Sequence, residues 1–324
     1  MNYIVFDLEW NQSPNGKKFQ NDRLPFEIIE IGAVKMNARK EIVDTFHRLI
    51  KPEVYKWIHD SIREVIHVNY SDLPYLQYEV DQYPFPEAAQ DFLKWCGEDW
   101  GFCTWGNQDV MELQRNMKYY GILDKLPGPV TYYDVQKLYS ICYEDGTSRR
   151  SLEYAIDKLN IEKEKDFHRA LADARYTAEV LKEIDDISIF SNSSLDVYQN
   201  PKTKKEEIHI SYPLYDKYVS REFAQRERIM KDREVTSTRC PICHLPAKRK
   251  IRWFMNNPKV YYSMSVCEKH GYIRGKIRIR KTEDEKYFVI KTLRIADMKE
   301  AEELLERKEV LRRKRQLKKK AEKQ

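Results

Sequence analysis

Ile4-Val5-Phe6-Asp7-Leu8-Glu9-Trp10 is an apolar run that ends in two carboxylates separated by one residue. In a β-strand, residues i and i+2 point to the same face, so Asp7 and Glu9 are expected to project side by side from a buried strand. Two adjacent like charges beside an apolar strand are costly unless a positive group neutralises them. A divalent metal ion is the usual solution. The alternative is an exposed edge strand that carries two solvated acids.

Length and composition predict a folded chain of more than one domain. The chain has 324 residues, of which 41% are apolar and 12% aromatic, so a substantial core is available. No apolar stretch approaches the roughly 18 residues of a membrane-spanning helix. The N-terminus also lacks the basic region of a secretory signal. A cytoplasmic protein without membrane association is therefore expected.

Charge is divided unequally along the chain. Residues 1–187 hold 23 Lys and Arg against 33 Asp and Glu, whereas residues 188–324 hold 35 against 19. Such a split predicts two modules with different tasks, and it makes the basic half a candidate for contact with a polyanion. The alternative is that the Lys-rich surface only aids solubility.

The first half alternates predicted strands and helices. Three early strands, over residues 4–10, 27–36 and 42–50, are joined by short links and indicate a meander. Later strands are expected over 101–106 and 130–133, and helices over 57–68, 86–95, 109–120, 151–159 and 168–184, with one more beginning at residue 134. This order predicts an α/β domain with a mixed sheet.

The second half has a different pattern. Residues 188–205 are polar and predict a linker, and residues 212–234 have the spacing of a helix. The following segment contains cysteines and β-prone runs, and the C-terminus is helical in pattern and very basic. The expected units are an α/β domain over 1–187, a linker and helix over 188–235, a small β-rich module over 236–296 and a basic helical tail over 297–324.

Two further segments carry candidate catalytic groups. Asp109 follows a short apolar strand at the start of a helix, where the alternative is a capping aspartate. His168 and Asp173 cannot share one face of a regular helix, but they converge if His168 lies on the loop entering the helix and Asp173 in its second turn. A histidine above a metal-bound aspartate can deprotonate a water, since histidine titrates near neutral pH. The alternative is a surface histidine at a helix start.

Together these segments resemble the three motifs of the DnaQ-like, DEDDh-type 3′–5′ exonucleases. The motifs are Asp7-x-Glu9, the segment from residue 104 to Asp109, and His168-x-Ala170-x-x-Asp173. The resemblance covers about the first 185 residues. Within the family, residues 25–34 look most like the Eri-like and KapD-like branch, whose members mostly act on RNA. Arg169 occupies the position that holds Tyr in the tyrosine-type variant, which leaves His168 as the candidate base.

The resemblance implies an RNase H-like mixed sheet and a two-metal hydrolase. Asp7, Glu9, Asp109 and Asp173 would hold two Mg²⁺ or Mn²⁺ ions, which prefer oxygen ligands, and His168 would take a proton from the attacking water. The implied reaction releases nucleoside 5′-monophosphates from single-stranded nucleic acid, with RNA favoured over DNA. The alternatives are a DNA-directed proofreader and a non-catalytic nucleic-acid- or ribosome-binding protein that has kept the fold.

Trp10 departs from many members of that family, which have a small residue or Thr after the first motif's Glu. An aromatic side chain at this position could stack on a terminal base of the substrate. It could equally fill the core.

A second candidate metal site lies in the basic half. Cys240 and Cys243 form a CxxC pair, and Cys267 and His270 follow after 23 intervening residues. The set has the right number of ligands for one tetrahedral structural Zn²⁺ and predicts a zinc-ribbon-like module held together by metal. The alternative is a chance cluster of free thiols. His244 could compete as a ligand, although its adjacency to Cys243 makes that geometry awkward.

Cations and aromatic residues interleave around this module. The alternation in Lys276-Ile277-Arg278-Ile279-Arg280 puts three cations on one strand face, and with Arg252 they form a candidate phosphate-tracking surface. The alternative is a solvated β face. The basic tail could bind RNA, the ribosome or another acidic partner, or remain solvated.

Overall fold

The computed structural model describes residues 1–59, 82–163, 169–213 and 215–321. The chain divides into two units, Met1–Gln199 and Asn200–Gln324. Among the described helices, none is long and apolar enough to cross a membrane.

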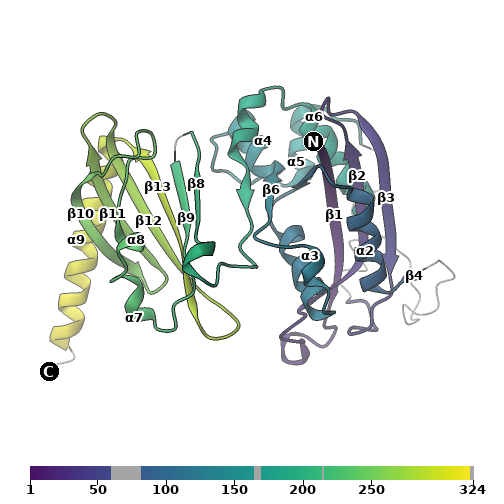
Figure 1. Cartoon of the computed structure of the whole chain (residues 1–324), viewed down its shortest axis with the longest axis horizontal. Coiled ribbons are helices and arrows are strands. Elements are labelled where there is room, and N and C mark those ends of the chain that lie inside the picture. The colour runs from purple at the N-terminus through teal and green to yellow at the C-terminus, as the bar shows by residue number, and fades with distance from the viewer. Residues whose placement is uncertain (60–81, 164–168, 214, 322–324) are drawn as a thin grey trace. The chain divides into compact units, whose positions relative to one another are not determined.

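The first unit is built on one mixed sheet. Its strands are β1 (Asn2–Gln12), β2 (Phe26–Met36), β3 (Ile42–Ile50), β4 (Gln82–Tyr83), β5 (Trp100–Thr104), β6 (Thr131–Asp134) and β7 (Ser194–Leu195), in the order β4-β3-β2-β1-β5-β6-β7 (Figure 1). The pairs β1–β2, β2–β3 and β6–β7 are antiparallel, and β1–β5, β5–β6 and β3–β4 are parallel. The predicted early meander and mixed sheet are confirmed.

Helices cover both faces of this sheet. They are α2 (Phe85–Cys96), α3 (Gln108–Tyr119), α4 (Val135–Tyr143), α5 (Leu152–Leu159) and α6 (Ala170–Lys182), with short 3₁₀ turns η1 (Lys17–Phe19), η3 (Leu123–Lys125) and η4 (Ile187–Asn192). Ser151 caps α5 as predicted, since its Oγ accepts from the Tyr154 N–H at 3.2 Å. The helix expected over residues 57–68 lies largely outside the described residues.

Alternation along β1 separates the core from the site. Ile4, Phe6 and Leu8 are buried in a cluster with residues of α2 and α3, whereas Val5 belongs to a second cluster with α4, α5 and α6. Because side chains alternate along a strand, Asp7 and Glu9 project to the same side as Val5.

Gly32 lets α6 lie directly on β2. A Cβ at this position would come within 2.0 Å of the Leu171 backbone nitrogen and 2.2 Å of the Ala170 carbonyl carbon. Gly32 is also the residue opposite Asp7 in the β1–β2 register. The first turn of α6, which carries Asp173, is therefore held against the strand pair that carries Asp7.

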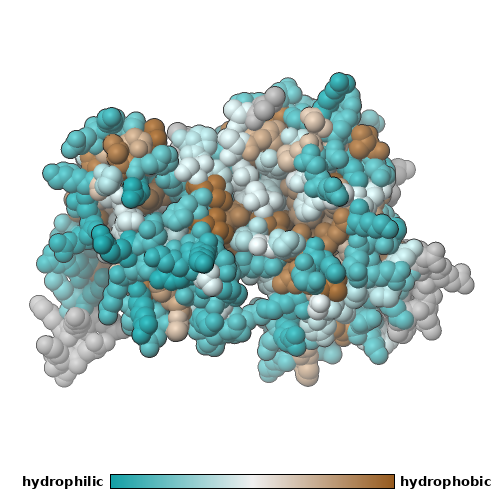
Figure 2. All heavy atoms as spheres, in the orientation of Figure 1, coloured by the Kyte–Doolittle hydropathy of each residue, from teal (hydrophilic) through white to brown (hydrophobic). Residues whose placement is uncertain are grey.

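The second unit is an antiparallel sheet with helices on both faces. Its strands are β8 (Ile208–Ser211), β9 (Tyr215–Val219), β10 (Lys248–Asn257), β11 (Val260–Cys267), β12 (Gly271–Lys281) and β13 (Tyr287–Ala296), in the order β10-β11-β12-β13-β9-β8. One face packs on α9 (Met298–Ala321) and the other on α7 (Arg226–Ile229) and α8 (Arg233–Thr236), and η5 (Lys204–Glu206) precedes β8. In the view of Figure 2 its surface is largely hydrophilic.

The helix predicted over residues 212–234 is wrong. Tyr212, Tyr215, Tyr218 and Val219 have helical spacing, but Tyr215–Val219 instead pair with β13 and with β8. This long-range pairing satisfies the backbone and buries Tyr218 and Val219, which are 3% and 0% exposed. Tertiary pairing overrides the local pattern here.

Two further expectations about this region need correction. The predicted linker over 188–205 includes β7, which pairs with β6, so its first part belongs to the sheet of the first unit. The β-rich module also begins before residue 236, because β8 and β9 join the same sheet as β10 to β13. Strand β10 itself was not predicted.

Candidate active site and metal centres

Three of the predicted acids converge in the first unit. Asp7 and Glu9 on β1 and Asp173 on α6 each offer a carboxylate oxygen, and these oxygens lie within 4.8 Å of one another. Asp173 lies in the first turn of α6 instead of the predicted second turn. The cluster is produced by strand alternation and by the close approach of α6 at Gly32.

Asp109 approaches the same place from another element. It is 5% exposed, and its Oδ1 accepts a hydrogen bond from the Leu8 N–H at 3.3 Å. This bond is available because β1 pairs with β5 only over residues 2–5, which leaves the later part of that edge open. Asp109 therefore contacts the strand segment between Asp7 and Glu9, and its carboxylate also accepts from its own backbone N–H in the first turn of α3.

The electrostatics of Asp7, Glu9 and Asp109 are those of a site that needs a cation. Burial, followed by repulsion from Asp109, Glu9 and Asp173, raises the pKa of Asp7 well above its ordinary range. Burial and then Glu30 raise the pKa of Glu9 to about 8. Burial raises the pKa of Asp109 to about 7, against two backbone N–H groups that lower it. Removal from water and mutual repulsion are the causes throughout.

This donor set fits hard divalent cations. Carboxylate oxygens are the ligands that Mg²⁺ and Mn²⁺ prefer, and the positive charge would offset the repulsion that raises these pKa values. Asp7, Glu9 and Asp173 could share one ion through the oxygens already gathered.

A charge network at Glu30 borders the site and was missed in the sequence. Glu30 is 4% exposed and lies opposite Glu9 in the β1–β2 register. Its Oε2 accepts from Arg169 Nε at 3.1 Å, and its Oε1 lies 2.8 Å from His47 Nε2. Arg169 also lowers the pKa of Glu9, although burial outweighs it. The available signal was an acid inside the apolar run Ile28-Ile29-Glu30-Ile31.

Two predicted residues have different outcomes. His168 lies outside the described residues. Trp10 is half-buried, packs against the core cluster and has its ring 6.0 Å from that of Phe26. This packing agrees with the core alternative for Trp10.

The second unit gathers the four predicted zinc ligands. Ligand atoms of Cys240, Cys243, Cys267 and His270 all lie within 4.8 Å of one another. The His270 Nδ1 is 3.4 Å from Cys240 Sγ and 3.7 Å from Cys267 Sγ, and the Sγ atoms of Cys243 and Cys267 are 3.7 Å apart. A tetrahedral zinc ion with bonds of about 2.3 Å to sulfur and 2.0–2.1 Å to nitrogen needs edges of roughly 3.5–3.8 Å.

Backbone N–H groups support two of these sulfurs. The amides of Ile242 and Cys243 donate to Cys240, and those of Lys269 and His270 donate to Cys267. The Lys269 and His270 amides lower the pKa of the Cys267 thiol to about 6. Thiolate is the form that binds zinc, so a cysteine stabilised in this form suits a metal ligand.

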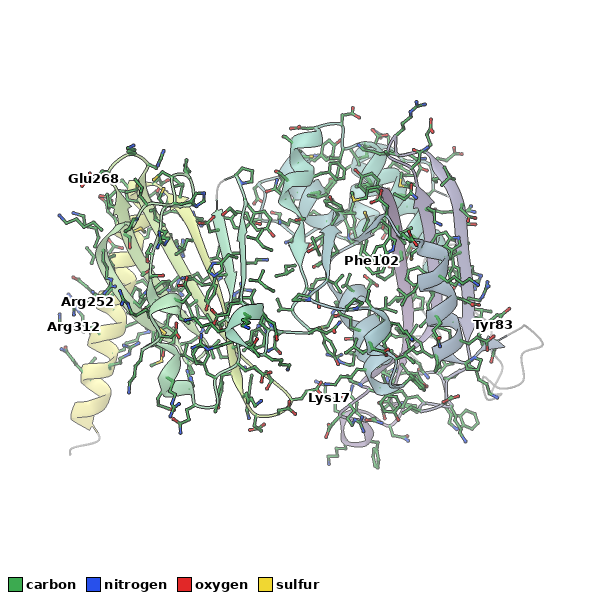
Figure 3. The ribbon with its side chains drawn as sticks, viewed as in Figure 1. Lys17, Tyr83, Phe102, Arg252, Glu268 and Arg312 are labelled. Carbon is green, nitrogen blue, oxygen red and sulfur yellow. The ribbon has the colours of Figure 1, made fainter. Side chains whose placement is uncertain are left out.

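The alternation predicted for β12 is confirmed. Ile277 and Ile279 are buried, whereas Arg278 and Arg280 are exposed and Lys276 is half-buried on the opposite face. Burial, followed by the neighbouring Arg278, lowers the pKa of Lys276. Arg252 is exposed on β10 (Figure 3) and lines a pocket with Ser265. Ser265 pairs with Ile273, so this pocket lies on the face of the sheet opposite to Lys276, Arg278 and Arg280.

Comparison with known proteins identifies the first unit. The family model described as exonuclease, of the RNase T type, matches residues 4–181, which is more than half of the chain. The chain belongs to this exonuclease family. The matched range contains Asp109 and the three clustered acids, and it ends before the second unit.

Several solved structures, some of them described as exonucleases, are similar to this one. A 3′-exonuclease described in 3′-end-specific recognition of a histone mRNA stem-loop is 18% identical, over 56% of this chain and 80% of that one, with a TM-score of 0.45. The Mg²⁺- and Mn²⁺-bound form of Pop2p from S. pombe is 19% identical, over 56% and 82%, with a TM-score of 0.42. Exonuclease I from E. coli with an oligonucleotide is 15% identical, over 56% and 39%, with a TM-score of 0.41. No curated protein matches the chain.

Proposed function

We propose that this exonuclease hydrolyses single-stranded nucleic acid from the 3′ end, releases nucleoside 5′-monophosphates and favours RNA over DNA. The observation that carries the proposal is the convergence of Asp7, Glu9 and Asp173 within 4.8 Å, in a domain that the exonuclease family model matches. The preference for RNA is supported by the similarity of residues 25–34 to the Eri-like and KapD-like branch.

The carboxylates have the role of holding two Mg²⁺ or Mn²⁺ ions. Asp7, Glu9 and Asp173 bind from the face of β1 and from α6, and Asp109 binds from the start of α3. When bound, the two ions lower the pKa of the attacking water and stabilise the charge that develops on the phosphate and the leaving 3′ oxygen.

His168 has the role of the general base that accepts the proton of the attacking water. Histidine suits this role because its ordinary pKa lies near neutral pH. Its chain neighbour Arg169 is anchored to Glu30 by an ion pair at 3.1 Å. This anchor holds Arg169 at the start of α6, and we assign it the role of a positioning contact for the base.

The second unit has the role of a zinc-stabilised module that binds nucleic acid. Cys240, Cys243, Cys267 and His270 hold one structural Zn²⁺, and Arg252 with the β12 cations Lys276, Arg278 and Arg280 contacts phosphates. The basic helix α9 suits an RNA-rich partner such as the ribosome, in a cytoplasmic setting.

The test compares RNA and DNA oligonucleotides of one sequence, each labelled at the 5′ end, with Mg²⁺, with Mn²⁺ and with a chelator. We expect stepwise shortening from the 3′ end that requires the metal, is faster on RNA and yields nucleoside 5′-monophosphates. Asp7→Asn should lower the rate by about a thousandfold or more, because it removes a metal ligand. Asp124→Asn, the same change at a side chain that is 72% exposed, is the matched control.

Each outcome separates the alternatives. No shortening of either strand would favour a non-catalytic nucleic-acid-binding protein, and faster shortening of DNA would favour a DNA-directed enzyme. Full activity in Asp7→Asn would reject the assigned site.

A further inference from the structure

A pocket of about 320 Å³ in the second unit has the chemistry of an anion site. It is lined by Thr238, Ala247, Arg249, Lys250, Arg252 and Ser265. Three of these six side chains are cationic, two carry hydroxyl groups and none is acidic. The pocket lies along β10, which is an edge strand of the sheet and therefore accessible from one side.

A β-bulge places the three cations together. In a regular strand, Arg249 and Lys250 would point to opposite faces. The β10–β11 register shifts between Arg249 and Ile251, so Lys250 is an extra residue on β10. A bulge of this kind re-aims side chains, which explains how two consecutive cations and Arg252 line one pocket while Ile251 remains buried.

Within the described part of the chain, the cations of this pocket have no acidic partner. Among the described residues, Arg249, Lys250 and Arg252 form no ion pair and no side-chain hydrogen bond. A concentration of three uncompensated positive charges against the sheet attracts an anion.

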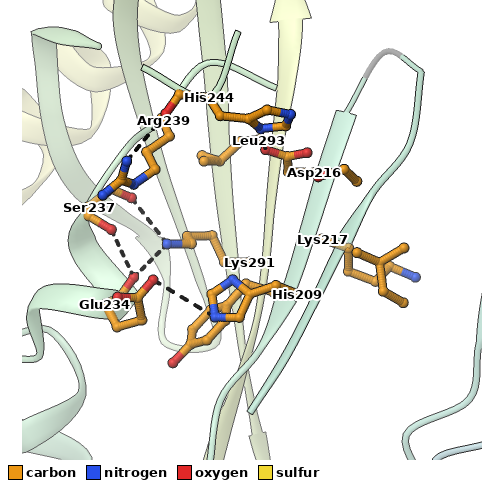
Figure 4. A pocket seen from close by; sticks show the side chains of 12 residues that line it. His209, Asp216, Lys217, Glu234, Ser237, Arg239, His244, Lys291 and Leu293 are labelled. Carbon is orange, nitrogen blue, oxygen red and sulfur yellow. Dashed lines mark hydrogen bonds and ion pairs between the residues drawn. The ribbon is translucent and has the colours of Figure 1, made fainter. Parts of the chain in front are cut away.

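A neighbouring pocket of the same unit shows the contrast (Figure 4). There the Lys291 Nζ donates to the Ser237 carbonyl at 3.1 Å and to the Glu234 carbonyl, and Asp216 Oδ2 lies 3.8 Å from His244 Nδ1. That pocket is lined by charges of both signs, whereas the charged side chains that line the β10 pocket are all positive.

Ser265 gives an independent sign that the pocket takes a ligand. It is 1% exposed and lines the pocket, and its buried Oγ has no hydrogen-bond partner among the residues that the structure describes. A buried hydroxyl without a partner costs stability unless a ligand supplies one. Ser265 is directly opposite Arg249 in the β10–β11 register, so the hydroxyl and the guanidinium can act on one anion.

We propose that the β10 pocket binds a phosphodiester of the nucleic acid strand. Arginine forks and hydroxyl donors are suited to the oxygens of a phosphate. The volume is at the lower end of the roughly 300–1,000 Å³ range of small-ligand sites, which suits one nucleotide unit of a single strand. The identity of the ligand rests on the proposed function, because a strand that is shortened at its 3′ end must be held by its phosphates.

The cysteine hairpin forms one wall of the pocket. Thr238 and Ala247 flank the hairpin that carries Cys240 and Cys243, and they are joined by a hydrogen bond from the Ala247 N–H to the Thr238 carbonyl at 3.1 Å. The metal-binding turn and the phosphate pocket are therefore built from the same segment.

The main experiment measures binding of a fluorescent single-stranded oligonucleotide to the full chain in an Asp7→Asn background, which prevents hydrolysis. Arg249→Ala with Arg252→Ala should raise the Kd about tenfold or more and reduce the salt slope by about 0.7 for each phosphate that the variant no longer binds. Lys204→Ala with Lys205→Ala is the matched control, because these exposed cations precede β8 at the opposite edge of the sheet. Equal losses of affinity in both pairs would overturn the proposal, since they would show only a general charge effect.

Ser265→Ala distinguishes binding in the β10 pocket from a general effect of surface charge, because the substitution leaves the net charge unchanged. The variant should bind the oligonucleotide several-fold more weakly while its melting temperature is maintained or raised, as removing an unpartnered buried hydroxyl does not cost a bond in the free protein. Unchanged affinity in this variant would overturn the assigned role of Ser265 and, with it, the proposal that the β10 pocket binds a phosphodiester.

Competition identifies the source of the phosphate. Inorganic phosphate and a nucleoside 5′-monophosphate should displace the oligonucleotide only at concentrations at least about a hundredfold above its Kd, because each offers a single unit of the strand. Displacement by the mononucleotide at the Kd of the oligonucleotide would reject a strand as the ligand. These binding measurements are independent of hydrolysis. If the chain proves inactive but the pocket variants still weaken oligonucleotide binding, the proposed exonuclease function is rejected and the phosphate site is retained.

Discussion

The carboxylate cluster of the first unit and the cysteine–histidine cluster of the second gather metal-type ligands in opposite ways. The acids Asp7, Glu9, Asp109 and Asp173 come from a strand and two helices of the first unit. Large buried clusters cover both faces of the sheet in that unit. The cysteine cluster lies on two turns, beside a small buried group that contains Ile273 and Leu293. The fold positions the carboxylates, whereas metal binding by the cysteines and histidine contributes to the stability of the fold.

The difference predicts what each unit does without its metal. The carboxylates repel one another, but the sheet and α6 hold them in place because Gly32 and the β1–β2 register are independent of any ion. The turns at Cys240 and Cys267 have little apolar burial of their own, so metal binding there is part of the free energy of folding. The first unit should keep its structure in a chelator, and the second should not.

The largest expected effect is the loss of the second unit's folded structure when a zinc ligand is removed. His270→Asn should lower the zinc content from about one equivalent to nearly none and abolish the melting transition of this unit, since structural zinc sites supply folding energy outright. The first unit's transition should be unchanged. Metal analysis and calorimetry on freshly purified, unchelated protein give the two readouts.

His244→Asn is the matched control for that variant. His244 follows Cys243 directly but lies outside the ligand cluster, and its φ of 56° is one that asparagine tolerates. It should retain full zinc content. Equal loss of zinc in both variants would make His244 a ligand, and a second unit that melts normally without zinc would remove the contrast between the clusters.

The sequence predicted the first unit better than the second for a physical reason. Apolar alternation in β1 to β3 and the helical periods of α2, α3 and α6 agree with the tertiary structure. Two of the four acids lie on β1, and the other two lie in the first turns of α3 and α6. The second unit depends more on long-range pairing. The segment 212–234 has helical spacing in isolation, and only its pairing with β13 makes part of it a strand.

Features that depend on register could not be predicted from the sequence. Glu30 is placed opposite Glu9 by the β1–β2 pairing, and its ion pair with Arg169 spans 139 residues of sequence. The bulge at Lys250 likewise exists only relative to β11. No local pattern shows which polar residues such pairings bring together.

Glu30→Gln tests how far the carboxylate site depends on surrounding charge. The change removes the charge that anchors Arg169 and should lower kcat by about tenfold with little change in KM, the size expected when a residue that supports a catalytic site is removed. Glu87→Gln, the same change at an exposed position of α2, should have no effect.

A double-mutant cycle with Arg169→Gln separates positioning from a general loss of stability. If Glu30 acts through Arg169, the double variant should be little worse than either single variant, because the two residues form one unit. Fully additive losses in kcat, or a fall in activity that follows the melting temperature, would show that Glu30 has only a structural role.

The smallest expected effect is a pH dependence of stability that belongs to the carboxylate cluster alone. Burial and neighbouring acids raise the pKa of Glu9 to about 8 and that of Asp109, chiefly through burial, to about 7. Carboxyl groups in the unfolded chain have pKa values of about 4. Between that pH and the raised pKa values, the folded state therefore holds protons that the unfolded state has released. Stability contributed by these groups is therefore present at low pH and lost as the pH rises toward 8.

In a chelator, the melting temperature of the first unit should fall by a few degrees between pH 5 and pH 8, and Mg²⁺ should reverse the fall because it replaces the lost protons as the neutralising charge. Glu9→Gln should flatten the curve in the metal-free protein, since the group that must ionise is gone. The second unit offers the internal comparison, because its cysteine ligands need deprotonation and its zinc affinity should rise with pH. We assign opposite pH dependences to the two clusters: stability falls with pH at the carboxylates, and zinc affinity rises with pH at the cysteines. A melting temperature of the first unit that rises with pH in a chelator would contradict this assignment.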